Sequence, residues 1–284
     1  MADQLDGSVG VALATLRTPD GYEPPAKSRK LLDGVRFDRV QRVGHKYTER
    51  FARWDATEAG RTDPSLCRGL YKFPDNVLFW ESKMAVDADG ATTPSVLKSS
   101  SGSQIKTSYC FSDAARTPVN AEIVPYFVVP TFDDPKRARP GKPFEGSRDR
   151  FTDDFALKLG HLGAVVFDGN IAGAIFADEG PAMKIGEASI RIHERIRKPG
   201  SPWKGDPANK ILLDASEEKG VLYFVFNDTP FDINAFGPAR QHDMATAIHE
   251  AAMARFEKMR EVGPTPRTTQ NGWTRLWRGA LTGS

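Results

Sequence analysis

The chain has 284 residues, 39% of them hydrophobic and 27% charged, which is typical of a soluble globular protein with one large domain or a core domain with appendages. The formal net charge is +2, and no block of Lys and Arg is dense enough to form a nucleic-acid footprint. No apolar run approaches the roughly 18 residues of a membrane helix. We therefore expect neither nucleic acid nor a membrane as partner.

Further sequence features concern export, disulfide bonds and cofactors. The first residues lack the charged-then-apolar pattern of a signal peptide, so we expect a cytoplasmic protein or export by a non-classical route. Only Cys67 and Cys110 are present, so no disulfide framework is expected. Walker A, dinucleotide and Gly-x-Ser-x-Gly motifs are missing, and His249-Glu250 lacks the second histidine of a zinc protease. We expect no metal or nucleotide cofactor.

The N-terminal third changes from a polar arm to β structure. Residues 1–65 are rich in charge, Gly and Pro, and residues 48–59 have weak helical character, so we interpret this part as an arm that wraps the core. A strand is predicted before the Asp89-Gly90 turn, and residues 95–103 form a Ser-rich loop. Residues 122–131 predict an apolar strand that Pro130 ends.

The segment 132–154 is charged and contains three prolines, so it is either a solvated insertion or a flap over a substrate groove. Apolar strands at 162–167 and 171–176 flank Asp168-Gly169-Asn170, the clearest hairpin of the chain. We expect a short helix from Glu187 or Ala188 to Ile196. A strand at 221–226 and an amphipathic helix at 243–261 complete the elements.

These elements predict a mainly β fold with peripheral helices (α+β) and a small barrel as its core. We divide the chain into the arm (1–65), a barrel domain (66–235), and a C-terminal helix and tail packed on the core (236–284).

Two carboxylates nine residues apart, Asp178 and Glu187, are the main catalytic candidates. Asp178 follows a predicted strand, and the loop before Glu187 contains glycines that can turn the chain back. A glycoside hydrolase needs such a pair: one carboxyl group protonates the leaving oxygen, and the other activates water or attacks the sugar. The alternative is that both are ordinary surface residues, as most Asp/Glu pairs at this spacing are.

The surrounding motifs resemble the fungal-type chitosanases of glycoside hydrolase family 75. The resemblance covers roughly residues 70–230, with matching pieces at 79–90, 124–130, 163–178 and Gly186-Glu187-Ala188-Ser189. It implies a six-stranded double-psi β-barrel and endo-cleavage of β-1,4 bonds in chitosan, by inversion, with Asp178 and Glu187 as the catalytic pair. Where the fungal enzymes have a cysteine in the Asp-x-Asp-Gly turn, this chain has Ala88.

Because a glutamic acid starts from a slightly higher pKa than an aspartic acid, we favour Glu187 as the general acid and Asp178 as the base. Asp87 and Asp89 either close a turn or, together with Glu179, attract the amines of a cationic amino sugar. Lys83 could also contact substrate.

The remaining candidates are aromatic or histidine side chains, or a metal loop. Tyr71 and Tyr126 could stack on sugar rings, whereas core packing is favoured for Trp80. A structural role is favoured for His193. The start of a calcium loop at Asp87-x-Asp89-Gly90 is not continued, because Thr92, Pro94 and Leu97 occupy later ligand positions.

Two other functions remain open at this stage. The protein could cleave peptidoglycan, for example as an antibacterial toxin, because a chain without disulfides or a signal peptide fits that role. It could also be a non-catalytic barrel that binds sugar or protein, with the helix at 243–261 as a docking element. The sequence leaves the oligomeric state open.

Overall fold

In the computed structural model, the described residues are 16–45, 47–48, 67–99, 104–130, 150–180, 185–197, 202–203 and 217–261. The strands are β1 (Gln41–Arg42), β2 (Cys67–Lys72), β3 (Val77–Asp87), β4 (Tyr126–Pro130), β5 (His161–Phe167), β6 (Asn170–Gly180), β7 (Glu187–Ser189) and β8 (Glu217–Pro230). The α-helices are α3 (Pro94–Ser99), α4 (Phe151–Asp154), α5 (Ile190–Ile196) and α6 (Gln241–Glu261). Short 3-10 helices are η1 (Ala26–Leu32), η2 (Phe37–Arg39), η6 (Ile233–Ala235) and η7 (Pro238–Arg240).

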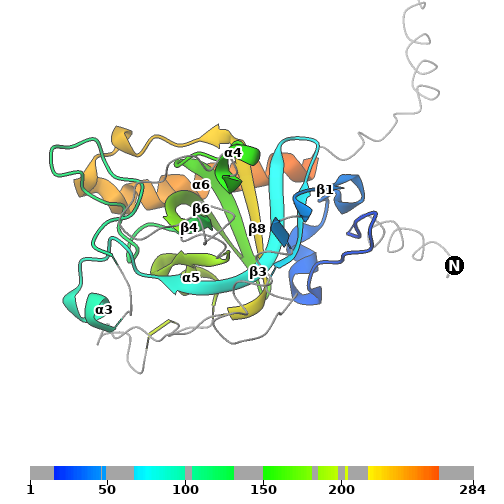
Figure 1. The fold of residues 1–284 in the computed structure, drawn as a ribbon, viewed down its shortest axis with the longest axis horizontal. Helices are drawn as coiled ribbons and strands as arrows, with labels where there is room; N and C mark the ends of the chain where they lie inside the picture. Colours follow the sequence, from blue (N-terminus) through cyan, green and yellow to red (C-terminus); the bar gives the residue numbers. More distant parts are fainter. Residues whose placement is uncertain are drawn as a thin grey trace, which may run out of the picture.

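Six strands close into a barrel in the order β3-β7-β4-β6-β5-β8, because β8 pairs back to β3 (Figure 1). The β3–β7 and β4–β6 pairs are parallel and the other pairs are antiparallel, so the barrel is mixed. Outside the barrel, β2 pairs with residues 78–82 of β3, before the stretch that pairs with β7, and β1 pairs with β2. The expected mainly β fold with a six-stranded barrel core and peripheral helices is confirmed.

The two faces of the strands carry two hydrophobic clusters. One contains buried side chains from all six barrel strands, including Trp80, Phe127 and Tyr223, and fills the barrel interior. The other covers the outer face, where strand side chains such as Phe224 pack with Phe256 of α6 and with residues of the N-terminal segment. Alternation along each strand produces this division, because successive side chains point to opposite faces.

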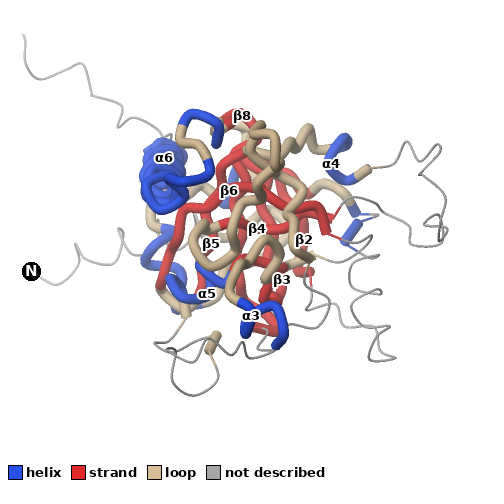
Figure 2. The backbone as a smooth tube through the Cα atoms, turned by 90° about the vertical axis from the view of Figure 1, so that its left-hand side faces the viewer, coloured by secondary structure: helices blue, strands red, loops and turns tan. Residues whose placement is uncertain are grey.

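Helix α6 flanks one side of the barrel (Figures 1 and 2). It comes unusually close to β6 at Gly173, where an added Cβ would lie 2.7 Å from the carbonyl oxygen of His249. The backbone N–H of Gly173 donates to Nδ1 of His249 at 3.0 Å, so a polar contact also joins helix and strand. The predicted amphipathic helix is confirmed, and its apolar face packs on the core.

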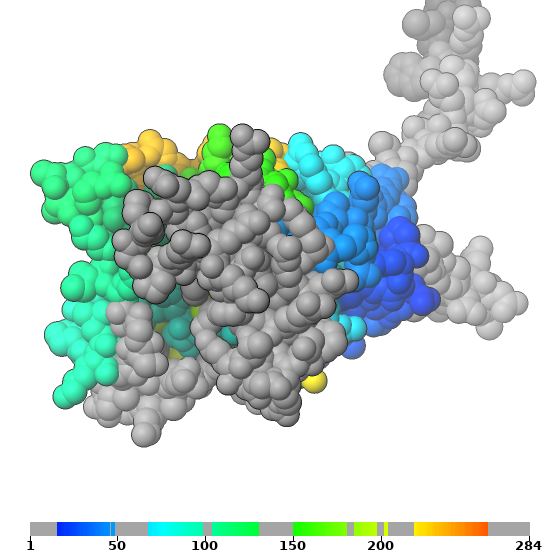
Figure 3. Space-filling model, viewed as in Figure 1, coloured from blue at the N-terminus to red at the C-terminus, as the bar shows by residue number. Residues whose placement is uncertain are grey.

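The N-terminal segment 16–45 packs against β2 and β3, and in Figure 3 it forms the blue flank beside their cyan surface. The hydroxyl of Tyr22 donates to Oε2 of Glu81 at 2.7 Å, and Glu81 is 2% exposed. Arg68 lies 3.6 Å from the other oxygen of Glu81. A buried carboxylate of β3 thus depends on a partner from the N-terminal segment.

Several local predictions need correction, while the hairpin prediction is confirmed. Asp168 and Gly169 have φ values of 48° and 83°, as a two-residue type I′ turn requires. The Ser-rich loop predicted at 95–103 was wrong for residues 95–99, which belong to α3, and the strand predicted at 122–131 begins only at Tyr126. The helix predicted from Glu187 or Ala188 starts at Ile190, because Ser189 is its N-cap and accepts from the N–H of Ile192.

Most of the helix predicted at 48–59 and of the charged segment at 132–154 lies outside the described residues. None of the described helices combines the length and apolar character needed to cross a membrane.

Candidate active site

Strand β4 brings the two candidate catalytic residues to the same side of the sheet. Val128 pairs with Asp178 of β6 on one side and with Glu187 of β7 on the other. Residues paired directly across strands point to the same face. Two strand spacings separate their Cα atoms by about 10 Å. The nine-residue spacing in sequence therefore becomes a juxtaposition across one intervening strand.

A β-bulge sets the direction of Asp178. Phe127 pairs with Phe176, but the next residue, Val128, pairs with Asp178, so Ala177 is the extra residue of β6. In a regular ladder Ala177 would pair with Val128, and Asp178 would be in register with Val129, whose side chain belongs to the interior cluster. Bulges next to active sites often redirect a side chain in this way.

The third strand of the site is β3, whose Ala85 pairs with Glu187. Asp87, two residues further, lies on the same face, and Asp89 follows in the turn. Carboxylate oxygens of Asp87, Asp89 and Asp178 all lie within 4.8 Å of one another. The structure therefore brings together the four carboxylates predicted at 87, 89, 178 and 187.

Two glycines shape the space around Glu187. A Cβ at Gly180 would lie 3.6 Å from Oε2 of Glu187, so this carboxylate reaches toward the end of β6, two residues beyond Asp178. Gly186 has φ of +86°, and a Cβ there would lie 2.2 Å from the carbonyl oxygen of Lys83. Only glycine allows the chain to pass β3 this closely just before Glu187.

Asp178 is 6% exposed and is held by three donors on one oxygen. Its Oδ1 accepts from the backbone N–H of Ser108 at 2.7 Å, from the Ser108 hydroxyl at 2.5 Å and from the N–H of Glu179 at 2.9 Å. Sequence reasoning missed Ser108, because its segment approaches β6 only in the folded chain.

Asp87 and Asp89 are bound by backbone donors as well. The N–H of Gln104 donates to Oδ1 of Asp89 at 2.5 Å, and the N–H of Asp89 donates to Oδ1 of Asp87 at 2.8 Å. The Tyr126 hydroxyl donates to the carbonyl oxygen of Asp89 at 3.0 Å. Asp89 is only 8% exposed. Both aspartates thus shape the turn while their carboxyl groups lie beside that of Asp178.

Burial and mutual repulsion keep protons in this cluster. Burial, followed by the charges of Asp89 and Asp178, raises the pKa of Asp87 well above its ordinary value. Burial raises the pKa of Asp89 to about 7, and the charges of Asp178 and Glu187 add to this effect. The pKa of Asp178 is also raised by burial, against the lowering effect of the hydrogen bonds from Ser108. Such clusters of raised pKa values are typical of functional sites.

The other predicted contact residues are placed as follows. Glu179 is half-buried, and its Oε1 lies 3.5 Å from Nη2 of Arg150. Lys83 lies on β3, where its carbonyl oxygen accepts from the Tyr223 hydroxyl at 3.2 Å. His193 is fully buried, with Nε2 lying 3.1 Å from the carbonyl oxygen of Ala85.

Stacking of Tyr71 and Tyr126 on sugar rings is wrong for this structure, because these side chains are 2% and 0% exposed. Trp80 is also fully buried and stacks on Tyr223 with ring centroids 5.2 Å apart, as favoured from the sequence.

Asp87, Asp89 and Asp178 also have the oxygen chemistry that binds Ca²⁺ or Mg²⁺. Each of them accepts a backbone N–H on one oxygen, and cation binding would require all three to lose their protons.

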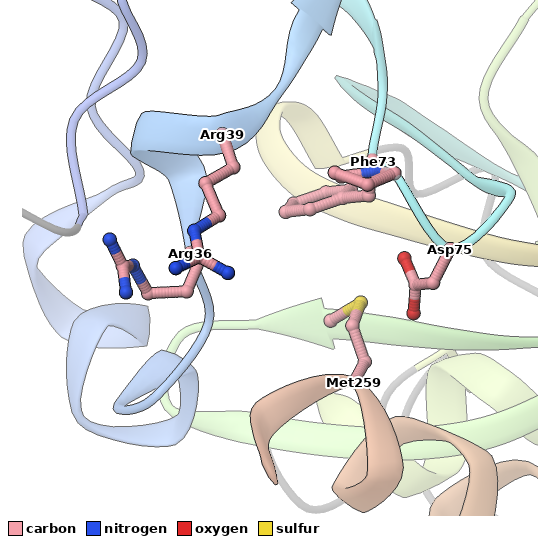
Figure 4. Close-up of a pocket in the computed structure, with 6 residues that line it drawn as sticks. Arg36, Arg39, Phe73, Asp75 and Met259 are labelled. Carbon is pink, nitrogen blue, oxygen red and sulfur yellow. The ribbon is translucent and has the colours of Figure 1, made fainter. Parts of the chain in front are cut away.

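A small pocket lies at the opposite end of β3 from the carboxylates, between the N-terminal segment, the β2–β3 turn and α6 (Figure 4). Its lining residues are Arg36, Arg39, Phe73, Pro74, Asp75 and Met259. In the close-up, Arg36 and Arg39 approach from one side and Asp75 from the other. This pocket contains none of the candidate catalytic residues.

A scan of the sequence against protein-family models gives no match, and a search among curated proteins finds no similar sequence.

Proposed function

We propose that this chain is a glycoside hydrolase that cleaves β-1,4 bonds within chitosan, with Asp178 and Glu187 as its catalytic pair. The observation that carries the proposal is the shared register of these two residues with Val128, which puts two carboxylates on one face of the barrel across a single strand. Their Cα separation of about 10 Å is compatible with carboxyl groups about 6.5–9.5 Å apart, the distance that leaves room for a water and gives inversion.

The environment of Asp178 supports its role as the general base, which leaves the role of general acid to Glu187. Three donors on Oδ1 favour the ionised form of Asp178, which a general base needs. Asp178 would remove a proton from the water whose oxygen attacks the anomeric carbon. Glu187 would donate its proton to the glycosidic oxygen as the bond from that oxygen to the anomeric carbon breaks. Asp178 ends protonated and Glu187 ionised, and exchange with solvent restores both.

The acidic surroundings support a cationic substrate. Asp87 and Asp89 adjoin the catalytic pair, and Glu179 follows Asp178 directly. When ionised, these groups attract the ammonium groups of glucosamine units. Peptidoglycan, whose N-acetylated sugars lack free amines, is the second candidate, because the raised pKa values of Asp87 and Asp89 reduce the negative charge of the site near neutral pH.

The test is release of reducing ends from chitosan of low acetylation, run in parallel with purified peptidoglycan. Wild type should act on chitosan, and Asp178→Asn and Glu187→Gln should each lower kcat by at least about 100-fold, the usual contribution of one acid or base. Asp243→Asn and Glu257→Gln are matched controls, because both side chains are exposed on α6 and pair with neighbouring arginines. Proton NMR of the first product should show the inverted anomer.

Activity on peptidoglycan alone would support the catalytic pair but identify peptidoglycan, and not chitosan, as the substrate. Polymer binding without hydrolysis would instead favour a non-catalytic binding protein. An active Asp178→Asn or Glu187→Gln variant would contradict the catalytic assignment.

A further inference from the structure

Ser108 reaches the site from a segment that runs beside the end of β6. The N–H of Tyr109 donates to the carbonyl oxygen of Ala177 at 2.9 Å, which places the preceding residue opposite Asp178. Within this segment the hydroxyl of Thr107 donates to the carbonyl oxygen of Tyr109 at 2.9 Å, which spans Ser108. Ser108 itself is exposed, so its side chain lies where the site opens to solvent.

The hydrogen bonds fix the orientation of the Ser108 hydroxyl. An ionised carboxylate can only accept, so the hydroxyl proton points to Oδ1 of Asp178 at 2.5 Å. The hydroxyl oxygen in turn accepts from the N–H of Glu179 at 3.0 Å. With the two backbone N–H groups already on Oδ1, this oxygen has no capacity for a further donor. Oδ2 is the oxygen of Asp178 left to receive a proton from water, and the side-chain hydrogen bond with Asp89 also falls on this carboxyl group.

We propose that Ser108 is a positioning residue for hydrolysis: it favours the ionised form of Asp178 and directs Oδ2 toward the attacking water. This inference rests on the proposed function, because it assumes that Asp178 is the general base. The effects on the pKa of Asp178 agree with this role, since burial raises this pKa and both hydrogen bonds from Ser108 lower it. Without the hydroxyl, burial would keep Asp178 protonated to a higher pH.

The effect of Ser108 has to be separated from that of the other titratable groups around Asp178. They come from β3 and its turn, β4, β6, β7 and the segment of Ser108, and they are Asp87, Asp89, Tyr126, Glu179, Glu187 and Cys110. Substitution of Ser108 leaves all of them in place, so a changed pH profile can be assigned to the lost hydroxyl.

The experiment compares the pH dependence of kcat/KM on chitosan for wild type, Ser108→Ala and Ser108→Thr. In Ser108→Ala the acidic limb should move up by about one pH unit, the effect of losing one hydrogen bond to a charged group. Below that limb kcat/KM should fall about tenfold through kcat, with KM unchanged. Ser108→Thr keeps a hydroxyl and should restore the wild-type limb. Ser112→Ala is the matched control, because Ser112 is exposed in the same segment and uses its backbone N–H for its contact with Asn234.

A second readout does not depend on turnover. Carbon-13 NMR of labelled aspartate carboxyls, with the Asp178 signal assigned from Asp178→Asn, should show a higher titration midpoint in Ser108→Ala than in wild type. An unchanged midpoint and an unchanged acidic limb would overturn the role of Ser108 even if the enzyme hydrolyses chitosan. If wild type is inactive on both polymers, the proposed function fails, and a shifted midpoint would then show that Ser108 controls Asp178 without serving hydrolysis.

Discussion

Replacement of Asp89 by asparagine should stabilise the protein more at pH 8 than at pH 5. Burial raises the pKa of Asp89 to about 7 from an ordinary value of 3.8. Between these two values the native state keeps a proton that the unfolded chain has released. The free energy of unfolding therefore falls as the pH rises through this window. At 1.36 kcal/mol per pKa unit, the loss amounts to at most about 4 kcal/mol by pH 8.

Asparagine keeps the shape of the side chain and cannot ionise. Its amide oxygen can still accept from the N–H of Gln104, as Oδ1 of Asp89 does at 2.5 Å. Its NH₂ group can donate to Asp178, the carboxylate with which Asp89 forms a side-chain hydrogen bond. The substitution thus removes the cost of ionisation without removing the contacts, and the gain at pH 8 should approach the full 4 kcal/mol only if no other carboxylate of the cluster takes up the proton.

The measurement is urea unfolding of wild type and Asp89→Asn at pH 5 and pH 8, followed by tryptophan fluorescence, to which the buried Trp80 contributes. Asp243→Asn is the control, because its exposed ion pair with Arg240 contributes less than about 1 kcal/mol at either pH. A stability difference between Asp89→Asn and wild type that is the same at both pH values would refute the reasoning.

Two further substitutions test how the site is supported. Gly186→Ala should destabilise the protein by about 3 kcal/mol or more and abolish activity, because its Cβ would lie 2.2 Å from the carbonyl oxygen of Lys83. Gly237→Ala is the control: Gly237 has φ of +73° and no heavy atom within 4 Å of an added Cβ, so this substitution should cost only about 1 kcal/mol in the same unfolding assay. Equal losses of stability in the two variants would contradict the steric account. Tyr22→Phe should lower the free energy of unfolding by about 1–3 kcal/mol, measured by thermal or urea unfolding, because it removes the hydroxyl donor 2.7 Å from Glu81, a carboxylate that is 2% exposed. An unchanged unfolding midpoint would show that this hydrogen bond between the N-terminal segment and β3 contributes nothing to stability.

Local signals in the sequence were sufficient where one segment determines its own structure. Asp168-Gly169-Asn170 predicted a hairpin, because Asp and Gly tolerate the positive φ values that a type I′ turn needs. The 3.6-residue period predicted α6, since a long helix that packs on one face must repeat its apolar residues. The start of α5 was missed by two or three residues, because Ser189 was not recognised as the N-cap.

Non-local features could not be predicted in this way. The Ala177 bulge depends on the register between β4 and β6, which are about 50 residues apart in sequence, and Ser108 contacts Asp178 from 70 residues away. The nine-residue spacing of Asp178 and Glu187 says nothing about Val128, the residue that places them on the same face. Composition alone did not specify the number of strands in the barrel either; the six strands were expected from the motif resemblance, and the structure has six.

The four carboxylates of the site differ in environment more than in chemistry, and this difference is what can separate acid from base. Asp178 has three donors on one oxygen, so its charge is supported despite burial. Asp89 adjoins it with a pKa raised to about 7, so near neutral pH Asp89 still keeps its proton in part of the molecules. A protonated Asp89 beside an ionised Asp178 leaves the base charged and reduces the electrostatic repulsion among the carboxyl groups. As the pH rises above 7 that proton is lost, and we expect both stability and the electrostatic balance of the catalytic pair to change together.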